Sequence, residues 1–305
     1  MTSAPMVSIG LPFFNPGKLL YIAAASVFAQ YFGDWELVLV DDGSTDGSLS
    51  VAQRIRDPRV RVYSDGARRG LSERLNEIAR EAKGKYLARL DADDFMHPDR
   101  LCSQVSRLEE CEEMELCGGS MFALDRDNVP IGVREARNYP TSPYGVMLRP
   151  PLAHATVIGR REWFVNNPYN VKLWRAEDYE LWCRTIPPTR WCNVEEPVYY
   201  YRCFSSFSVK KYVRSTIAGL RAILMHGPGR VGRVRTAWLL ARRVAKMLAH
   251  AGGAAFGLTD FMLRSSMRRM TRAERERAEA GILAVMECEV PGVGVPAEVI
   301  ATSAA

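Results

Sequence analysis

Strand-like and helix-like patterns alternate along the first hundred residues of this chain. Four short apolar runs each precede a segment in which apolar residues recur at helical spacing. The apolar runs are Val7–Leu11, Trp35–Val40, Val60–Tyr63 and Tyr86–Leu90, and the helical segments follow from about Pro16, Ser48, Leu71 and Pro98. This alternation predicts βαβ units, and therefore an α/β fold with a mainly parallel sheet flanked by helices. Asn15 is expected to cap the first helix, with Pro16 in its first position.

Polar residues directly follow three of the predicted strands. They occupy positions 12–15, 41–44 and 91–94. In parallel sheets, ligands bind in a crevice at the carboxyl ends of the strands. We therefore expect these three polar segments to converge on one crevice.

The acidic segment after the fourth strand reads Asp91-Ala92-Asp93-Asp94. Residues two apart on an extended chain point to the same side, so Asp91 and Asp93 can face one ligand. Two close carboxylates repel each other unless a cation lies between them or one is protonated. Mg²⁺ or Mn²⁺ suits such oxygen ligands, with diphosphate oxygens completing the shell. An acidic turn before the next helix is the alternative, but the position at the end of a buried strand favours a metal site, with Asp94 as a secondary or structural acid.

The other two polar segments offer contacts to a nucleotide. Asp41 and Asp42 can accept hydrogen bonds from a base or a ribose, whereas Asp46 and Ser48 read as turn and cap residues. The run 68–71, Arg-Arg-Gly-Leu, precedes a predicted helix N-terminus, which is a natural place for phosphate contacts. Two solvated arginines in a loop are an equally good interpretation of that run.

A second acidic pair, Glu177 and Asp178, lies at the predicted start of another helix. A carboxylate there, aimed into a cleft, would be a competent general base. Acidic residues also stabilise helix N-termini without any catalytic role. The pattern of residue types leaves these two interpretations open.

Taken in order, these segments resemble the family 2 glycosyltransferases of the GT-A fold over about residues 6–209. The segments that carry the resemblance are Val7–Asn15, Ser26–Gln30, Glu36–Asp46, Gly70–Tyr86, Leu90–Asp94, His154–Thr156, Ala176–Trp182 and Tyr201–Arg202. Phe204 stands where the family has a histidine. That contact to metal or phosphate is expected to be absent, or to be supplied by His154, His97 or Arg202.

The resemblance implies inverting transfer of a sugar from a nucleotide diphosphate donor, with UDP as the preferred nucleotide. Asp178 would be the catalytic base, with Glu177 beside it, and Asp91 and Asp93 would hold Mg²⁺ or Mn²⁺. The implied donor site comprises Pro12, Phe14, Asn15, Asp41, Asp42, Ser44, Arg69, Leu71, Asn76, Asp91, Ala92, Asp93, His154 and Arg202. The acceptor would be a glycan or a lipid-linked sugar in surface polysaccharide or glycolipid synthesis.

The net charge of +6 is concentrated in the last third of the chain. Between Lys210 and Arg272 many basic residues face a single acid, Asp260. In the predicted helix 236–250, one face carries Leu240, Val244, Met247 and Leu248, and the other carries Arg242, Arg243, Lys246 and His250. Such a helix suits the surface of an anionic membrane, although packing on the catalytic domain or a second subunit would explain it as well. Nucleic-acid binding is not expected, because interleaved aromatic residues are missing.

We therefore expect a catalytic domain at 1–209, with a nucleotide-binding half at 1–100 and an acceptor half at 101–209. A basic helical region follows at 210–305, in which Thr271 and Glu274 form a capping box and the residues from Pro291 on are disordered. Seven scattered cysteines without a C-x-x-C pair indicate a reducing compartment.

No secretory signal is visible, and no apolar stretch reaches about 18 residues, so a cytoplasmic enzyme at the inner face of the membrane is expected. Two other functions would require different residues. A sugar nucleotidyltransferase would need a basic, glycine-rich loop after the first strand, and an inactive nucleotide-sugar-binding module would not need Asp91, Asp93 and Asp178. The sequence leaves the oligomeric state open.

Overall fold

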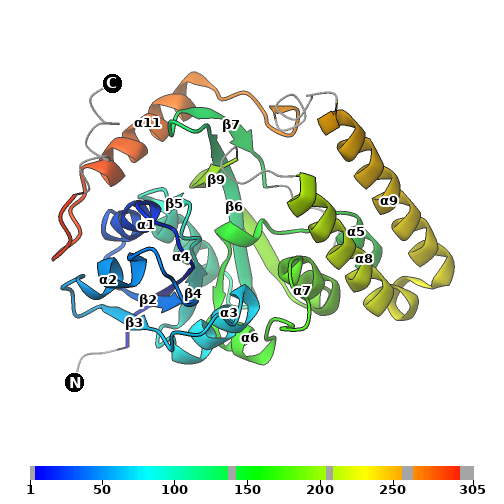
Figure 1. The fold of residues 1–305 in the computed structure, drawn as a ribbon, viewed down its shortest axis with the longest axis horizontal. Helices are drawn as coiled ribbons and strands as arrows, with labels where there is room; N and C mark the ends of the chain where they lie inside the picture. Colours follow the sequence, from blue (N-terminus) through cyan, green and yellow to red (C-terminus); the bar gives the residue numbers. More distant parts are fainter. Residues whose placement is uncertain (1–3, 137–141, 204–208, 256–263, 296–305) are drawn as a thin grey trace.

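The computed structural model describes residues 4–136, 142–203, 209–255 and 264–295. Within these residues nine strands form one mixed sheet in the order β3-β2-β1-β4-β8-β6-β9-β5, with β7 paired to β6. Helices cover both faces of the sheet (Figure 1). Phe204 and residues 296–305 lie outside the described residues. The expected disorder from Pro291 on is wrong for residues 291–295, because Val293 is buried and the Arg56 amide donates to the Pro291 carbonyl at 2.7 Å.

The first four strands are parallel neighbours, as the alternating pattern predicts. They are β1 (Val7–Phe13), β2 (Trp35–Asp41), β3 (Val60–Tyr63) and β4 (Tyr86–Arg89). The helices between and after them are α1 (Leu19–Phe28), α2 (Ser48–Gln53), α3 (Leu71–Glu81) and α4 (Arg100–Glu109). Leu37 and Leu39 of β2 pack in the cluster that contains α1, whereas Val38 and Val40 pack in the cluster that contains α3. Each side of this strand is therefore covered by a helix, which explains its continuous apolar run.

The predicted cap of the first helix is wrong. Helix α1 begins at Leu19, and Lys18 occupies the cap position, where its side chain makes no capping hydrogen bond. Asn15 instead has a positive φ of 50° and its side-chain oxygen accepts a hydrogen bond of 2.7 Å from the Thr45 amide. The side chain that the sequence assigns to a helix cap therefore joins the turn after β1 to the turn after β2.

The second half of the sheet is mixed because β8 runs antiparallel to both β4 and β6. Its strands are β5 (Phe95–Met96), β6 (Leu116–Leu124), β7 (Pro130–Arg134), β8 (Ile158–Arg160) and β9 (Trp191–Arg202). The short helices of this half are α5 (Pro143–Leu148), η1 (His154–Thr156), α6 (Arg161–Asn166) and α7 (Glu177–Thr185). This half brings the residues around 154 and 177 to the edge where β4 ends.

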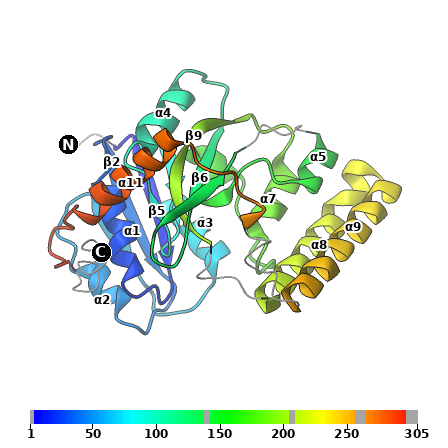
Figure 2. The same ribbon diagram turned by 90° about the horizontal axis from the view of Figure 1, so that it is seen from above.

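The helices of the basic C-terminal region lie at two opposite ends of the molecule (Figures 1 and 2). Helices α8 (Val209–Val231) and α9 (Arg233–Ala255), joined at Gly232 with a φ of 81°, pack together against α5 and α7. Helix α11 (Arg272–Met286) returns to the other end and packs on α1. None of the described helices is long and apolar enough to cross a bilayer.

The predicted division of α9 into one apolar face and one basic face is wrong in part. Leu240 and Met247 are half-buried, but Leu248 is 63% exposed. Arg243 is half-buried and lies against Tyr179 of α7, with 4.3 Å between its guanidinium carbon and the ring centroid. Part of the basic face thus packs inward, and part of the apolar face points to solvent.

The predicted capping box of α11 is confirmed. The Thr271 hydroxyl accepts a hydrogen bond from the Glu274 amide at 3.2 Å, and the Glu274 carboxylate accepts one from the Thr271 amide at 2.8 Å. Arg268 adds ion pairs to Glu274 and to Glu135, each at 2.6 Å. Strong local bonds therefore fix the start of the helix that covers α1.

Replacing Thr271 with alanine is expected to lower the free energy of unfolding by about 1 kcal/mol, because an amide at the start of α11 loses its acceptor. Urea unfolding measures the change. Ser50→Ala, an exposed position on α2, is the control and should change stability by less than about 0.5 kcal/mol. Equal stability of the Thr271 variant and the unmodified protein would contradict the role given to this cap.

Candidate functional site

The turns after β1 and β2 are bonded to each other at the carboxyl edge of the sheet. The Asn15 amide donates to the Ser44 hydroxyl at 3.0 Å, and the Ser44 amide donates to Asp41 at 2.9 Å. Pro12, one of the predicted donor residues, is buried within β1. The exposed ring of Phe14 lies next to these turns, with the Arg68 guanidinium carbon 3.9 Å from its centroid.

The two aspartates that end β2 are held by the chain itself. Asp41 is buried and accepts a further hydrogen bond from the Ser64 hydroxyl at 2.9 Å. Asp42 accepts hydrogen bonds from the amides of Arg69 and Gly70, at 2.7 and 2.9 Å, and from Nε of Arg74 at 3.1 Å. The Asp42 carboxylate therefore fixes the loop that precedes α3. A contact from Asp42 to a nucleotide stays a prediction.

Arg74 is a structural centre that the sequence did not single out. Its side chain is almost fully buried and makes ion pairs with Asp42, Asp65 and Glu77. Asp65 also pairs with the half-exposed Arg69 at 2.6 Å. The loop that carries Arg69 is thus held by Asp42 at the end of β2 and by the ion pairs of Asp65 with Arg69 and Arg74.

A pocket of about 340 Å³ opens beside this loop. Arg69 and Leu71 line one side, and Val171, Leu173 and Trp174 line the other. Asn76, another predicted donor residue, does not enter it. The Asn76 side-chain nitrogen donates to the Tyr169 carbonyl at 2.9 Å, and the side-chain oxygen accepts a hydrogen bond from the Tyr169 amide at 2.8 Å. Asn76 therefore positions the loop that carries Tyr169.

An ion pair between Arg89 and Asp91 lies where β4 ends. The Arg89 guanidinium donates to both carboxylate oxygens, at 3.0 and 2.6 Å, and Arg89 is only 8% exposed. The fully buried Arg100 holds the Arg89 carbonyl at 2.9 Å, and the Asp91 amide donates to the Tyr199 hydroxyl at 3.1 Å. The sequence reasoning missed Arg89. Its signal was a single charge inside an otherwise apolar strand, which is unusual unless the charge is paired.

The next two aspartates point in different directions. Asp93 is exposed, with the half-buried Ala92 before it, whereas Asp94 is buried and accepts a hydrogen bond of 2.9 Å from the Arg202 amide. The Arg202 guanidinium donates to the Asp93 carbonyl at 2.5 Å. Burial, followed by the charges of its acidic neighbours, raises the pKa of Asp94 well above its usual value. Although the Asp93 side chain reaches the surface, the densely packed residues around it partly desolvate the carboxyl, and this effect, followed by the charge of Asp91, raises the pKa of Asp93.

Glu177 and Asp178 begin α7 after two residues with left-handed backbone, Arg175 (φ 65°) and Ala176 (φ 70°). The Tyr179 amide donates to Asp178 at 2.7 Å. Burial, followed by the charge of Asp178, raises the pKa of Glu177 to about 7. Burial also raises the pKa of Asp178. Two adjacent non-glycine residues at positive φ are uncommon, and such strain tends to occur at functional sites.

Arg89 forms an ion pair with Asp91 and also acts electrostatically on Glu177 and Asp178. Its positive charge opposes the rise in pKa at both Glu177 and Asp178, and the charge of Asp91 contributes to the rise at Glu177. Electrostatic effects of this kind act between groups that lie close together. Glu177 and Asp178 therefore lie close to the Arg89–Asp91 pair, and their assignment to one catalytic site stays a prediction.

His154 completes the buried side of this site. Its Nε2 lies 2.8 Å from the Tyr169 hydroxyl. Burial, followed by the charge of Arg89, lowers the pKa of His154 well below its usual value. The ring is therefore neutral near pH 7 and cannot serve as a cation for phosphate. His97, by contrast, is buried, stacks on Tyr200 with 5.7 Å between ring centroids and contacts α11 through Arg277, so it packs into the core.

The acidic edge offers an incomplete set of metal ligands. Asp91 and Asp93 supply hard carboxylate oxygens, but the described residues contain no group of three His, Cys, Asp or Glu side chains placed to hold an ion. The charge of Asp91 also acts on Asp93, so the two carboxylates lie close enough to share a cation. The residues therefore fit a divalent ion that takes its remaining ligands from a bound diphosphate.

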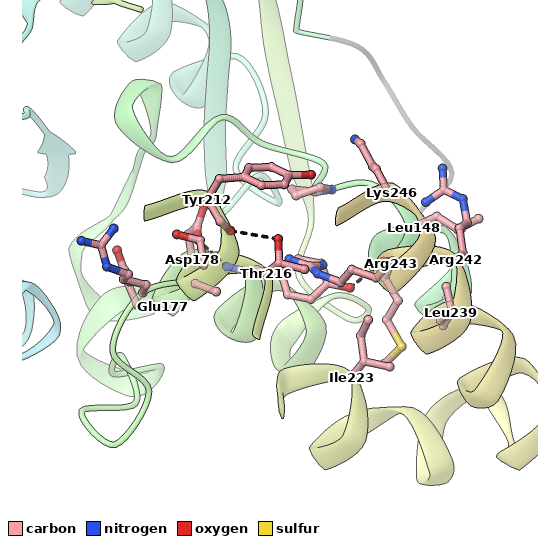
Figure 3. Close-up of a pocket in the computed structure, with 16 residues that line it drawn as sticks. Leu148, Glu177, Asp178, Tyr212, Thr216, Ile223, Leu239, Arg242, Arg243 and Lys246 are labelled. Carbon is pink, nitrogen blue, oxygen red and sulfur yellow. Dashed lines mark hydrogen bonds between the residues drawn. The ribbon is translucent and has the colours of Figure 1, made fainter. Parts of the chain in front are cut away.

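A pocket of about 520 Å³ lies on the other side of the acidic pair at the start of α7 (Figure 3). Glu177 and Asp178 line it, together with residues from α5, α8 and α9. Its basic lining residues are Arg175, Arg242, Arg243 and Lys246. Glu177 and Asp178 therefore lie between Arg89 and this second pocket, which is lined by basic residues.

Comparison with known proteins gives consistent results. The model of glycosyl transferase family 2 matches residues 8–181. EpsE of Bacillus subtilis (strain 168), described as a glycosyltransferase, is 32% identical over 211 residues, or 66% of this chain and 74% of that protein. The UDP-Glc:alpha-D-GlcNAc-diphosphoundecaprenol beta-1,3-glucosyltransferase WfaP of Escherichia coli is 30% identical over 184 residues, or 59% of this chain and 70% of that protein.

Among solved structures, the mannosyltransferase PcManGT from Pyrobaculum calidifontis, in complex with GDP-Man and Mn²⁺, superposes with a TM-score of 0.58. It is 17% identical, and the match covers 93% of this chain and 86% of that one. The likeness in fold confirms the GT-A architecture expected from the sequence.

Replacing Glu177 with glutamine is expected to stabilise the protein at pH 8 by roughly 1–3 kcal/mol and to change its stability little at pH 4. The raised pKa of about 7 means that this carboxyl favours folding while protonated. That stabilisation is lost as the pH rises through 7, and glutamine mimics the protonated form throughout.

Urea unfolding of both proteins at the two pH values measures the difference. Glu196→Gln, at an exposed position, is the control. A gain at pH 8 no larger than that of the control would contradict the unfavourable ionisation of Glu177.

Proposed function

Because this chain belongs to glycosyl transferase family 2, we propose that it transfers a sugar from a UDP-sugar, with inversion, to a glycan or lipid-linked acceptor. The observation that supports this most is the ion pair of Arg89 with Asp91 at the end of β4, because the same Arg89 charge also acts on Glu177 and Asp178 at the start of α7. A donor site and a base must share one cleft for in-line displacement. The product would be a surface polysaccharide or glycolipid.

The donor nucleotide fits the edge formed by the turns after β1 and β2 and the loop before α3. Phe14 and Arg68 offer an exposed ring and guanidinium for a base, and Asp41 and Asp42 fix the surrounding loops. Arg69, half-exposed at the start of α3, is placed to contact phosphate. The diphosphate would then extend along the edge toward Asp93.

Asp178 is the proposed general base. The acceptor hydroxyl oxygen bonds to the anomeric carbon while the bond from that carbon to the diphosphate oxygen breaks, and Asp178 takes the hydroxyl proton. Burial raises the pKa of this carboxyl, which strengthens it as a base near neutral pH. Glu177, with a pKa of about 7, is placed to contact the acceptor or to share the proton.

Asp91 and Asp93 are the proposed holders of Mg²⁺ or Mn²⁺. A divalent ion there would offset the charge on the departing diphosphate. The bidentate pair with Arg89 keeps the Asp91 carboxylate in a fixed orientation, and Arg202 fixes the Asp93 peptide. These bonds preorganise the carboxylates before any ligand arrives.

Helix α9 is the proposed contact with the inner face of an anionic membrane. Val234, Trp238 and Leu248 are 85%, 50% and 63% exposed. At 100° per residue these three positions lie within about 80° of each other, with arginines on the flank. An exposed apolar stripe beside basic residues is typical of helices that lie on membranes, and it would place the enzyme beside a lipid-linked acceptor.

Replacing Asp178 with asparagine is expected to lower the turnover number for transfer by about 100-fold to 10,000-fold and to leave UDP affinity nearly unchanged, because only the proton acceptor is removed. UDP release across a panel of UDP-sugars with Mn²⁺ measures turnover, and calorimetry measures UDP binding. No turnover by the unmodified protein with any donor would support an inactive module instead. Full transfer by the variant would eliminate Asp178 as the base.

Replacing Asp93 with asparagine is expected to abolish the gain in UDP affinity that Mn²⁺ gives to the unmodified protein, because an oxygen ligand of the ion loses its charge. Calorimetric titration of UDP with Mn²⁺ and with EDTA measures that gain. Asp127→Asn, at an exposed position, is the control and should retain it. Equal UDP affinity of the unmodified protein with and without metal would contradict a metal site here.

A further inference from the structure

The pocket between α5, α7, α8 and α9 has a chemistry that the transfer reaction alone does not require. Apart from Glu177 and Asp178, its charged residues are four cations, Arg175, Arg242, Arg243 and Lys246. Four positive charges against two carboxylates leave an excess of two. Three hydroxyl-bearing residues of α8, Tyr212, Ser215 and Thr216, also line it. The pocket therefore combines positive charge with hydrogen-bonding groups (Figure 3).

The four cations are balanced only in part by the two carboxylates of the pocket. No ion pair within 4 Å joins any of the four to a carboxylate in the part of the chain that the structure describes. Arg242 and Arg243 instead lie near the rings of Trp238 and Tyr179, at 5.9 and 4.3 Å. Partial removal from water, followed by the charges of Arg242 and Arg243, lowers the pKa of Lys246. Grouped like charges of this kind are stabilised by a bound anion.

The packing of α8 against α9 fixes the position of the Arg243 guanidinium. A Cβ atom at Gly219 of α8 would collide with the Arg243 guanidinium, so glycine lets Arg243 cross α8 toward Tyr179. The charge of Arg243 also acts on Asp178. The cationic group is thus held against the proposed base, within reach of an acceptor bound there.

The position of the pocket distinguishes it from the donor site. It contains none of Asp91, Asp93, Arg68 and Arg69, which lie along the proposed donor edge. It opens instead between α7 and the α8–α9 pair, which is the end of the molecule away from α11 (Figure 2). An anion bound here would belong to the acceptor.

The helical geometry of α9 places the pocket next to the exposed apolar stripe. At 100° per residue, Arg242 and Lys246 lie between the buried Leu239 and the stripe of Val234, Trp238 and Leu248. An anionic group held by Arg242 and Lys246 could therefore carry an alkyl chain along that stripe. A phosphate joined to a lipid matches both features, because it has a compact charge that guanidinium and ammonium groups bind well.

We propose that this pocket binds the phosphate group of a phosphorylated, lipid-linked acceptor, with Arg242 and Lys246 as the residues that hold the phosphate. The proposal rests on the glycosyltransferase function argued above and names the acceptor class for that function. Bound in this way, the phosphate anchors the acceptor while its sugar hydroxyl reaches Asp178. Arg242 and Lys246 are positioning and specificity residues for the acceptor.

The test is calorimetric titration of the full chain with UDP and Mg²⁺ present at saturation, so that the donor diphosphate site is filled. The probes are decyl phosphate below its micelle concentration, inorganic phosphate, and glucuronate as a carboxylate of sugar size. The pocket variant is Arg242→Gln/Lys246→Gln. The control is Arg221→Gln/Arg233→Gln, which removes the same charge from exposed positions of α8 and α9 outside the pocket.

Decyl phosphate is expected to bind the pocket variant about tenfold more weakly than the unmodified protein, and the control within about twofold of it. Tighter binding of decyl phosphate than of inorganic phosphate identifies a lipid-linked phosphate, whereas equal binding of the two identifies a site for free phosphate and overturns the lipid-linked acceptor. Unchanged binding by the pocket variant, or glucuronate bound as tightly as decyl phosphate, would overturn the phosphate assignment.

UDP binding, titrated alone for each protein, separates two kinds of failure. If UDP binds and decyl phosphate does not, the assignment of this pocket is overturned while the transferase function stands. If the unmodified protein does not bind UDP, the proposed function fails first. Thermal unfolding of each variant checks that a loss of binding does not reflect a loss of folding.

Discussion

The site depends on one ion pair, the buried Arg89 with the half-buried Asp91, at the end of a strand that is otherwise apolar. Removing one partner of a fully buried pair costs roughly 3–5 kcal/mol, and the cost is smaller here because Asp91 is partly solvated. The cost of burying Arg89 is offset by the bidentate bond to Asp91 and by the Arg100 guanidinium, which fixes its backbone carbonyl. This single cation then opposes the rise in pKa at Glu177 and Asp178 and helps to keep His154 neutral. Burial is the larger cause of these shifts, and Arg89 is the one cation among the described residues that acts on all three residues.

The change from parallel to antiparallel pairing gives this ion pair its neighbours. Strand β8 runs antiparallel beside β4, and η1, which carries His154, directly precedes it. Asn76 of α3 holds the backbone of Tyr169, whose hydroxyl meets His154. Residues separated by about ninety positions are thus joined near Arg89 by hydrogen bonds of side chains that are buried or partly buried. Preorganisation of this kind is what an active site requires to stabilise charge that develops during a reaction.

Local patterns in the sequence predicted the local features and not the long-range ones. The strands of the first half and the capping box at Thr271 follow from periodicity and residue type, which act over a few positions. Asn15 was misjudged because its partner is Thr45, thirty residues away, rather than the next helix. Arg74 was missed because an arginine on a helix usually faces solvent, and only the fold brings three carboxylates around it. The same limit applied to α9, where the packing partner decides which face is buried.

The proposed base stands between two guanidinium groups of different kinds. Arg89 is neutralised by its own carboxylate, so its effect on Asp178 is constant, whereas Arg243 belongs to a cluster with excess positive charge. If that cluster binds the acceptor phosphate, the anion screens Arg243 and the pKa of Asp178 rises further. The base would then become stronger when the correct acceptor is in place and stay weaker when water alone fills the pocket. Electrostatic coupling between acceptor and base would favour transfer to the acceptor over hydrolysis of the donor, without any change of conformation.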